Sequence, residues 1–280
     1  MPLYRDMDQA ALDAAYDNAA AVGKDKRTSY VEGWAARSRA LLGANPQALL
    51  DLAYGATPRE RLDFIACGRA DAPTLAYFHG GYWQSNDKET YAFIAEGLLP
   101  AGFNFALIEY TLAPAARMDR IVAEARAAVA WLLSNLGELG GDPARLYLAG
   151  HSAGGHLVAM AMDEKRLAGG LAISGLYDLE PIRLNYLNDK LALDRAEAAR
   201  NSPLLHLPER AARLLVAVGT QELPELVRQS RIYFRAWTQK GLVGEYLPQA
   251  GRDHFSVLEE LARPDGKLLA ALLALDAKRR

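Results

Sequence analysis

One pentapeptide constrains the fold of this chain more than any other feature: Gly150-His151-Ser152-Ala153-Gly154, which has the form G-x-S-x-G. An apolar run precedes it at 146–149, and a second apolar run follows it at 157–162. This context predicts a tight turn from a buried strand into a helix. Glycines at both ends tolerate a turn in which side chains would collide, so the Ser152 hydroxyl is left exposed at the end of the strand. A glycine-rich turn with an incidental serine is the alternative, but the flanking segments favour Ser152 as a nucleophile.

The rest of the chain alternates between strand-like and helix-like patterns. Between 118 and 136, apolar residues recur at three- and four-residue spacing, which predicts a long helix with one apolar face. The other predicted helices are 153–163, 224–240 and 255–277, and the predicted strands are 49–54, 61–67, 74–79, 103–110, 145–149, 170–174, 213–218 and 243–247. Such alternation predicts a mostly parallel sheet with helices on both faces. Together with the pentapeptide, it predicts the α/β-hydrolase fold.

We predict a single domain over residues 1–280, a length that one large α/β domain can reach. The first 45 residues form two predicted helices, 7–22 and 28–42, which we expect to pack on the domain. The stretch 181–208 interrupts the alternation with a helix-like amphipathic piece. This segment is therefore a candidate cap over a site.

A second motif, His79-Gly80-Gly81, directly follows the apolar strand predicted at 74–78. In the α/β-hydrolase fold, a glycine-rich loop at this position donates backbone N–H groups to an oxyanion. We therefore expect the amides of Gly80 and Gly81, with that of Ala153, to form an oxyanion hole. A plain Gly-Gly turn is the alternative, but two motifs in the expected order argue against it.

The general base of this fold is a histidine that follows the nucleophile and the acid. Of the five histidines, only His206 and His254 lie far enough beyond Ser152. His206 falls in the candidate cap, whereas His254 follows the last predicted strand and precedes the last helix. We therefore predict that His254 is the base.

The acid is expected in the loop after the strand predicted at 213–218. Glu222 lies just past this strand, whereas Glu225 follows a proline and fits the first turn of a helix. Asp178, after the preceding strand, and Asp253, beside the predicted base, are the remaining alternatives. We predict that Glu222 orients His254.

The chain resembles the kynurenine formamidase (arylformamidase) group, a relative of the hormone-sensitive-lipase-like esterases. The motifs that carry the resemblance are the segment 79–83, the turn 150–155, and the segments 225–230 and 251–255. Tyr82 and Trp83 after the two glycines are the more specific element, because the broader esterases vary there. A weaker likeness is Glu109-Tyr110-Thr111-Leu112-Ala113-Pro114, which resembles Asp-Tyr-Arg-Leu-Ala-Pro of the wider family. Eukaryotic members usually carry aspartate where this chain has Glu222.

The resemblance implies hydrolysis of N-formyl-L-kynurenine to formate and kynurenine, without a metal or organic cofactor. Tyr82 and Trp83, and His151 beside the nucleophile, are the expected substrate-binding residues. A promiscuous carboxylesterase acting on short acyl or aryl esters is the main alternative. A non-catalytic ligand-binding protein on the same scaffold is a remote one, because all three triad positions are filled.

Composition limits the partners of this chain. The formal net charge of −2 offers no excess positive potential for a polyanion, so we expect no nucleic-acid partner. No run of about 18 apolar residues occurs, and the N-terminus lacks the pattern of a signal peptide. We therefore expect a cytoplasmic protein without a membrane partner, and exposed apolar residues on the helices leave a homodimer open.

Overall fold

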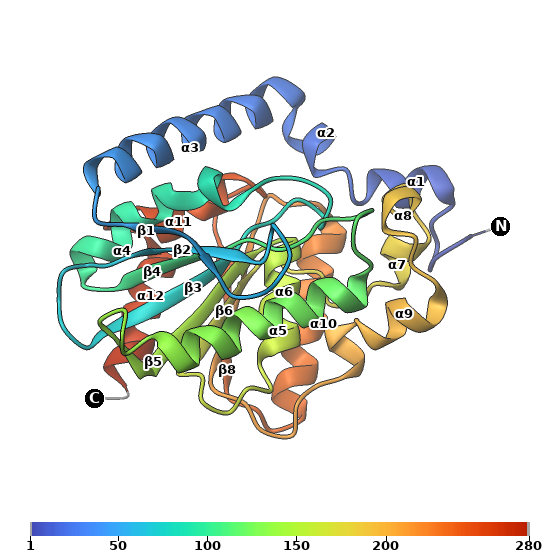
Figure 1. Cartoon of the computed structure of the whole chain (residues 1–280). Helices are drawn as coiled ribbons and strands as arrows, with labels where there is room; N and C mark the ends of the chain where they lie inside the picture. Colours follow the sequence, from blue (N-terminus) through green and yellow to red (C-terminus); the bar gives the residue numbers. More distant parts are fainter. Residues whose placement is uncertain (1, 279–280) are drawn as a thin grey trace.

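A mostly parallel sheet forms the centre of the molecule in the computed structural model, which describes residues 2–278 (Figure 1). Its strands, in spatial order, are β1 (Leu49–Ala53), β2 (Arg61–Ile65), β4 (Asn104–Ile108), β3 (Ala72–Phe78), β5 (Gly141–His151), β6 (Gly169–Ile173), β7 (Leu214–Gly219) and β8 (Gly244–Gln249). Strands β1 and β2 run antiparallel to their neighbours, and all pairs from β4 to β8 are parallel. The α/β fold expected from the sequence is confirmed.

The central strands are apolar throughout because helices cover both of their faces. In β3, Ala76 and Phe78 point into one core, whereas Leu75 and Tyr77 point into the other. The first core is closed by α5 (Met118–Asn135), α6 (Ala153–Ala161) and α10 (Pro224–Gln239). The second is closed by η1 (Lys88–Ile94), α4 (Ala95–Ala101), η3 (Ser256–Leu258), α11 (Glu259–Ala262) and α12 (Lys267–Ala277).

Two helical segments differ from the sequence-based prediction. The helix predicted at 255–277 is interrupted at 263–266, where Pro264 cannot continue a helical hydrogen-bond pattern. The segment 88–101, which was not assigned to a helix, forms η1 and α4. Its side chains are buried on most sides, so it lacks the one-sided apolar pattern that identifies a surface helix.

The N-terminal segment forms three helices instead of the predicted two: α1 (Gln9–Ala14), α2 (Asn18–Val22) and α3 (Lys24–Ala44). Gly23, with φ of 93°, separates α2 from α3. Helix α3 lies across η1 and α4 in Figure 1, and its Trp34 is part of the second core. Arg37 on the same helix forms ion pairs with Glu96 and Glu259.

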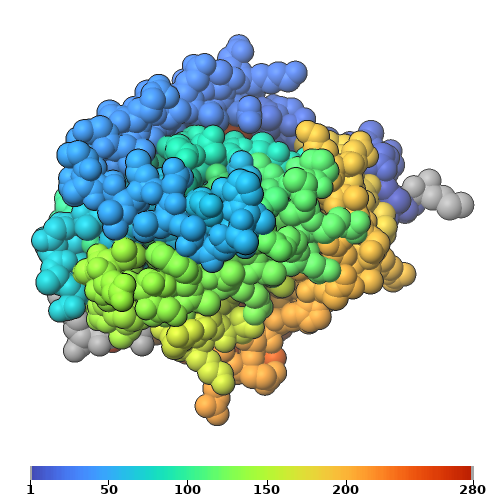
Figure 2. All heavy atoms as spheres, in the orientation of Figure 1, coloured from blue at the N-terminus to red at the C-terminus, as the bar shows by residue number. Residues whose placement is uncertain are grey.

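The candidate cap contains α7 (Glu180–Arg183), α8 (Asn188–Leu191), α9 (Arg195–Arg200) and η2 (Pro203–Leu205). It touches the N-terminal segment, because the Tyr186 amide donates to Asp13 at 2.9 Å and the Gln9 side chain donates to the Leu184 carbonyl at 3.1 Å. Figure 2 shows the blue N-terminal atoms beside the yellow atoms of this segment. No helix within residues 2–278 is long and apolar enough to span a membrane.

Candidate active site

The backbone at Ser152 is strained and is fixed by its neighbours. Ser152 joins β5 to α6 with φ of 57° and ψ of −117°, a conformation that side chains rarely adopt. A Cβ atom on Gly154 would lie 1.9 Å from the Phe78 carbonyl oxygen, and one on Gly150 would lie 2.3 Å from the Gly154 carbonyl oxygen. Both positions therefore require glycine, as the pentapeptide predicted. The turn sets Ser152 in the wall of a cavity at the carboxyl ends of the strands.

Glu222 and His254 form a buried hydrogen-bonded pair. Glu222 follows β7 and His254 follows β8, and the imidazole Nδ1 lies 2.6 Å from Glu222 Oε2. Glu222 Oε1 accepts two more hydrogen bonds, from the Gly219 amide at 2.7 Å and the Ser174 hydroxyl at 2.5 Å. An ionised carboxylate only accepts hydrogen bonds, so His254 donates from Nδ1 and its Nε2 is left as a base. His254 lines the same cavity as Ser152.

The alternative acids and the alternative base are occupied elsewhere. Glu225 pairs with Arg228 at 2.7 Å, and Asp253 pairs with a lysine of α3 at 2.9 Å. Asp178 accepts a hydrogen bond from an N-terminal tyrosine at 2.9 Å. His206 contacts a backbone carbonyl of α9 and does not line the cavity. The structure therefore brings His254 together with Glu222 and not with these residues.

The glycine loop after β3 lies against the nucleophile turn. A Cβ atom on Gly80 would lie 3.1 Å from the Ser152 Cβ, and Gly81 has φ of 116°, which favours glycine. Among residues 2–278, the amide N–H groups of Gly80, Gly81 and Ala153 have no hydrogen-bond acceptor. Three free donors beside a serine hydroxyl are the arrangement that an oxyanion hole requires.

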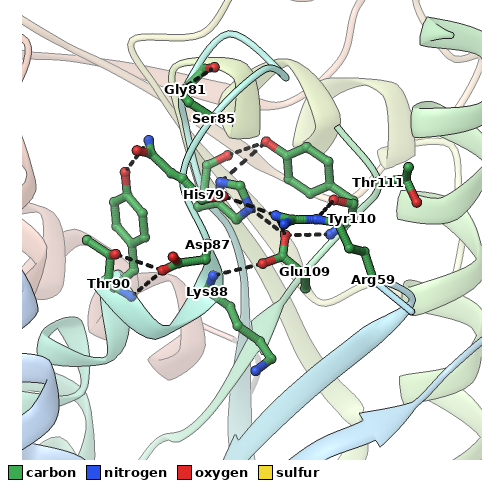
Figure 3. A network of polar contacts seen from close by, with 12 residues as sticks. Arg59, His79, Gly81, Ser85, Asp87, Lys88, Thr90, Glu109, Tyr110 and Thr111 are labelled. Atoms are coloured by element: carbon green, nitrogen blue, oxygen red, sulfur yellow. Dashed lines mark hydrogen bonds and ion pairs between the residues drawn. The ribbon is translucent and has the colours of Figure 1, made fainter. Parts of the chain in front are cut away.

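A buried network of polar side chains holds the glycine loop in place (Figure 3). The His79 ring donates from Nδ1 to the Gly80 carbonyl oxygen at 2.8 Å, and its Nε2 lies 2.9 Å from Glu109 Oε1. Arg59 approaches the same carboxylate oxygen at 2.6 Å, and Asn86 donates to the Gly80 carbonyl oxygen at 3.1 Å. Burial raises the pKa of Glu109, but His79 and Arg59 outweigh it and hold the pKa below its usual value.

The peptide group between Gly80 and Gly81 is polarised by these contacts. Its carbonyl oxygen accepts two hydrogen bonds, one of them from His79, and its N–H is one of the three free donors. Hydrogen bonds to a carbonyl strengthen the N–H of the same peptide as a donor. Glu109 was not among the predicted site residues, although it follows β4 directly and lies in the segment that resembles Asp-Tyr-Arg-Leu-Ala-Pro of the wider esterase family.

The predicted substrate-binding residues have different environments. Tyr82 lines the cavity, and its hydroxyl donates to the Tyr16 carbonyl at 2.7 Å and accepts from Asn18 at 2.9 Å. The structure corrects the prediction for Trp83, whose side chain does not line the cavity. The ring is fully buried and packs edge-on against His156, with ring centroids 4.9 Å apart. Its positive φ of 57° turns the side chain into the core, so it packs the loop rather than facing substrate.

His151 lines the cavity beside His254, with ring centroids 4.5 Å apart. Burial and the neighbouring His254 lower the pKa of His151 well below its usual value, so the ring is neutral. Its Nε2 is buried and has no hydrogen-bond partner among residues 2–278.

The cavity has a volume of about 270 Å³. It is lined by the nucleophile turn, the glycine loop and His254, together with residues of the N-terminal helices and the cap. The residues of the N-terminal segment and the cap that line it are Asp17, Asn18, Ala19, Arg27, Val31, Trp34, Tyr186, Leu187 and Lys190. The N-terminal residues of this set were not predicted from the sequence. No motif distinguishes helices that pack on a domain from helices that line a site.

Comparisons with known proteins agree with this geometry. The family model BD-FAE matches residues 65–169. The chain is 33% identical to a kynurenine formamidase of Danio rerio and 34% identical to one of Salmo salar, with 83% of this chain and 83% of each relative covered. A crystal structure of a candidate thioesterase from Silicibacter sp. superposes with a TM-score of 0.84 at 30% identity, covering 93% of this chain and 98% of that chain.

The fold and the site define an α/β-hydrolase enzyme with the features of a serine hydrolase. The sequence identity to the two fish proteins, and the share of each chain that the match covers, are high enough to show the family. The chain belongs to the kynurenine formamidase family.

Proposed function

We propose that this protein hydrolyses N-formyl-L-kynurenine to kynurenine and formate, with Ser152 as nucleophile, His254 as base and Glu222 as the acid that orients the base. The observation that carries the proposal is the 2.6 Å contact between His254 Nδ1 and Glu222 in a cavity that Ser152 also lines. Membership of the kynurenine formamidase family supports the choice of substrate. A homodimer in the cytoplasm stays a prediction from the sequence.

The proposed reaction has two halves. His254 accepts the hydroxyl proton of Ser152 as its oxygen bonds to the formyl carbon, and the amides of Gly80, Gly81 and Ala153 donate to the resulting oxyanion. The carbon–nitrogen bond then breaks, the arylamine leaves with the proton from His254, and a formyl ester remains on the serine. Water attacks this ester with His254 again as base, and formate leaves as the serine regains its proton.

A carboxylesterase is the second candidate. The observation that favours it is that Ser152, His254 and the glycine loop line one cavity, and in the proposed reaction they act only at the acyl carbon, where a formamide and a short ester are alike. An ester leaving group needs less assistance than an amine, so the same groups would cleave both.

Steady-state kinetics on N-formyl-L-kynurenine and p-nitrophenyl acetate, with Ser152→Ala as the blank, separate the two candidates. We expect kcat/KM on the formamide at or above about 10⁴ M⁻¹s⁻¹, in the range of ordinary enzymes, and no turnover by the variant. Rapid ester cleavage with negligible formamide turnover would instead favour the carboxylesterase. Activity of the Ser152→Ala variant equal to that of the wild type would contradict the mechanism.

A further inference from the structure

Three residues that carry a full charge line the cavity: Asp17, Arg27 and Lys190. Asp17 is partly used by the fold, because its Oδ1 accepts a hydrogen bond from the Ala20 amide at the start of α2. Lys190 is exposed to solvent, which screens its charge. Arg27 is partly buried, and within residues 2–278 its guanidinium has no hydrogen-bond acceptor and no carboxylate within 4.0 Å.

The absence of a partner sets Arg27 apart from the other cations of α3 that face the domain. Lys26 pairs with Asp253 at 2.9 Å, and Arg37 pairs with Glu96 at 2.6 Å. Arg27 is next to Lys26 in sequence but turns toward the cavity. A partly buried guanidinium without a counter-ion keeps its donors free for an anion, and its reduced hydration strengthens the attraction.

The surroundings of Arg27 place its charge on the side of the cavity that adjoins the oxyanion loop. Burial and the Asp87 carboxylate raise the pKa of the Tyr91 hydroxyl, and the nearby Arg27 guanidinium opposes them. The Tyr91 hydroxyl accepts a hydrogen bond from Asn86 at 3.0 Å. The same Asn86 amide donates to the carbonyl of the loop beside the nucleophile, at 3.1 Å.

Aromatic rings occupy the same region. Trp34, Tyr91 and Phe255 all line the cavity, and the Trp34 ring lies 5.9 Å from that of Tyr91 and 6.2 Å from that of Phe255. Flat apolar walls favour a planar aromatic group, and a guanidinium beside them favours a carboxylate, which it can bind through two parallel hydrogen bonds.

We infer that Arg27 determines specificity by binding a carboxylate carried on the aromatic leaving group of the substrate. The substrate class is therefore an acylated arylamine whose ring bears a side chain that ends in an anion. This inference rests on the proposed function for the substrate site and for the arylamine leaving group, and Arg27 adds to it the anion on the side chain. N-formyl-L-kynurenine has a carboxylate at the end of such a side chain, whereas simple aryl esters do not.

The test compares the binding of two amines that differ by one carboxylate, L-kynurenine and kynuramine. Neither is turned over, so isothermal titration gives their dissociation constants for the wild-type protein directly. We expect L-kynurenine to bind about tenfold or more tightly than kynuramine, as a charge-assisted hydrogen-bonded pair would produce. Arg27→Gln should abolish the difference by weakening L-kynurenine alone, and Arg27→Lys should retain part of it.

Two matched variants test whether the effect belongs to Arg27. Lys26→Gln removes a neighbouring cation that is paired with Asp253, and Lys190→Gln removes the exposed cation of the cavity. Both should retain the preference for L-kynurenine. Equal binding of the two amines to the wild type, or a preference that persists in Arg27→Gln but is lost in Lys190→Gln, would overturn the inference.

Turnover distinguishes this inference from the proposed function. A protein that prefers L-kynurenine through Arg27 but cleaves only esters would have the inferred carboxylate site and a different reaction. A protein that hydrolyses N-formyl-L-kynurenine while binding both amines equally would have the proposed reaction without the inferred site.

Discussion

The Glu222 carboxylate accepts hydrogen bonds from three separate segments: His254 after β8, the Gly219 amide at the end of β7, and the Ser174 hydroxyl after β6. Its side chain is fully buried. The three donors fix the orientation of the carboxylate, and a carboxylate oxygen accepts hydrogen bonds, so the imidazole tautomer that bonds to it has its proton on Nδ1. At the scale of a single residue, substitutions at position 222 can therefore change the charge and the length of the side chain separately.

Glu222→Gln should lower kcat by about 10³-fold to 10⁴-fold while the fold is retained, because an amide can present its NH₂ group to His254 and select the wrong tautomer. Glu222→Asp keeps the charge but shortens the side chain by one methylene, so we expect a smaller loss of kcat. Steady-state kinetics on both variants, with circular dichroism as the folding control, provide the measurement. A larger loss in Glu222→Asp than in Glu222→Gln would show that the length of the side chain, and not its charge, determines the contribution of this position.

The oxyanion loop and its supporting network act at the scale of elements. His79 at the end of β3 and Glu109 at the end of β4 meet at 2.9 Å because the two strands are parallel neighbours. Their contact orients the peptide between Gly80 and Gly81. Both residues lie behind the loop, so they are positioning residues and not catalytic ones.

Glu109→Gln should lower kcat by about tenfold to hundredfold with little change in KM, less than the loss of an oxyanion donor itself. The reason is that a neutral amide holds His79 less firmly, and the donor is needed in the transition state rather than for substrate binding. Glu109→Asp, the residue of the wider esterase family, should retain more activity. A rise in KM with unchanged kcat would contradict this role, and thermal unfolding of both variants controls for stability.

A second contact between elements, Lys26 of α3 with Asp253, predicts a dependence of stability on pH. Burial raises the pKa of Asp253, but the Ser256 amide and the Lys26 ammonium outweigh it, and the pKa falls from 3.8 to about 2. A group with a lowered pKa in the folded state stabilises the fold above its unfolded pKa, and the contribution disappears as the pH falls through the folded pKa. The relevant window therefore lies between about pH 4 and pH 2.

Asp253→Asn should thus lower the free energy of unfolding by about 1 kcal/mol at pH 7, because solvent around Lys26 screens the pair, and by much less near pH 2. Urea unfolding of the variant and the wild type at several pH values measures the difference. A difference that stays constant down to pH 2 would mean that the aspartate stabilises by packing and not by its charge. Activity is not the readout here, because residue 253 adjoins the proposed base.

The order of the elements could be predicted from the sequence, whereas the walls of the site could not. The nucleophile turn, the glycine loop and the candidates for base and acid follow from local patterns: small residues at tight turns and apolar runs at buried strands. Arg27 belongs to no such pattern, and the motif that contains Glu109 gives no sign of its contact with His79, because these two residues are distant in sequence. The interruption of the last helix at Pro264 could have been predicted from the proline itself. Apolar residues at helical spacing on both sides of it favoured one continuous helix instead.

At the scale of the whole molecule, residues 2–45 pack into the two cores beside the sheet. Leu12 and Tyr16 are fully buried in the core that contains α5 and α6, and Trp34 is in the other core. Arg37 connects α3 to Glu96 and Glu259. The N-terminal segment therefore contributes to both cores and to the wall of the cavity at once.

This arrangement predicts that the chain unfolds in one cooperative transition, because α3 packs on η1 and the side chains of Leu12, Tyr16 and Trp34 are part of the two cores. Urea unfolding followed by far-ultraviolet circular dichroism and by tryptophan fluorescence should give the same midpoint. Comparison with Trp34→Phe isolates the fluorescence change of Trp34 on α3 from that of the other tryptophans. A Trp34 signal that changed at a lower urea concentration than the ellipticity would show that α3 unfolds independently. Arg27 would then leave the cavity before the rest of the fold is lost.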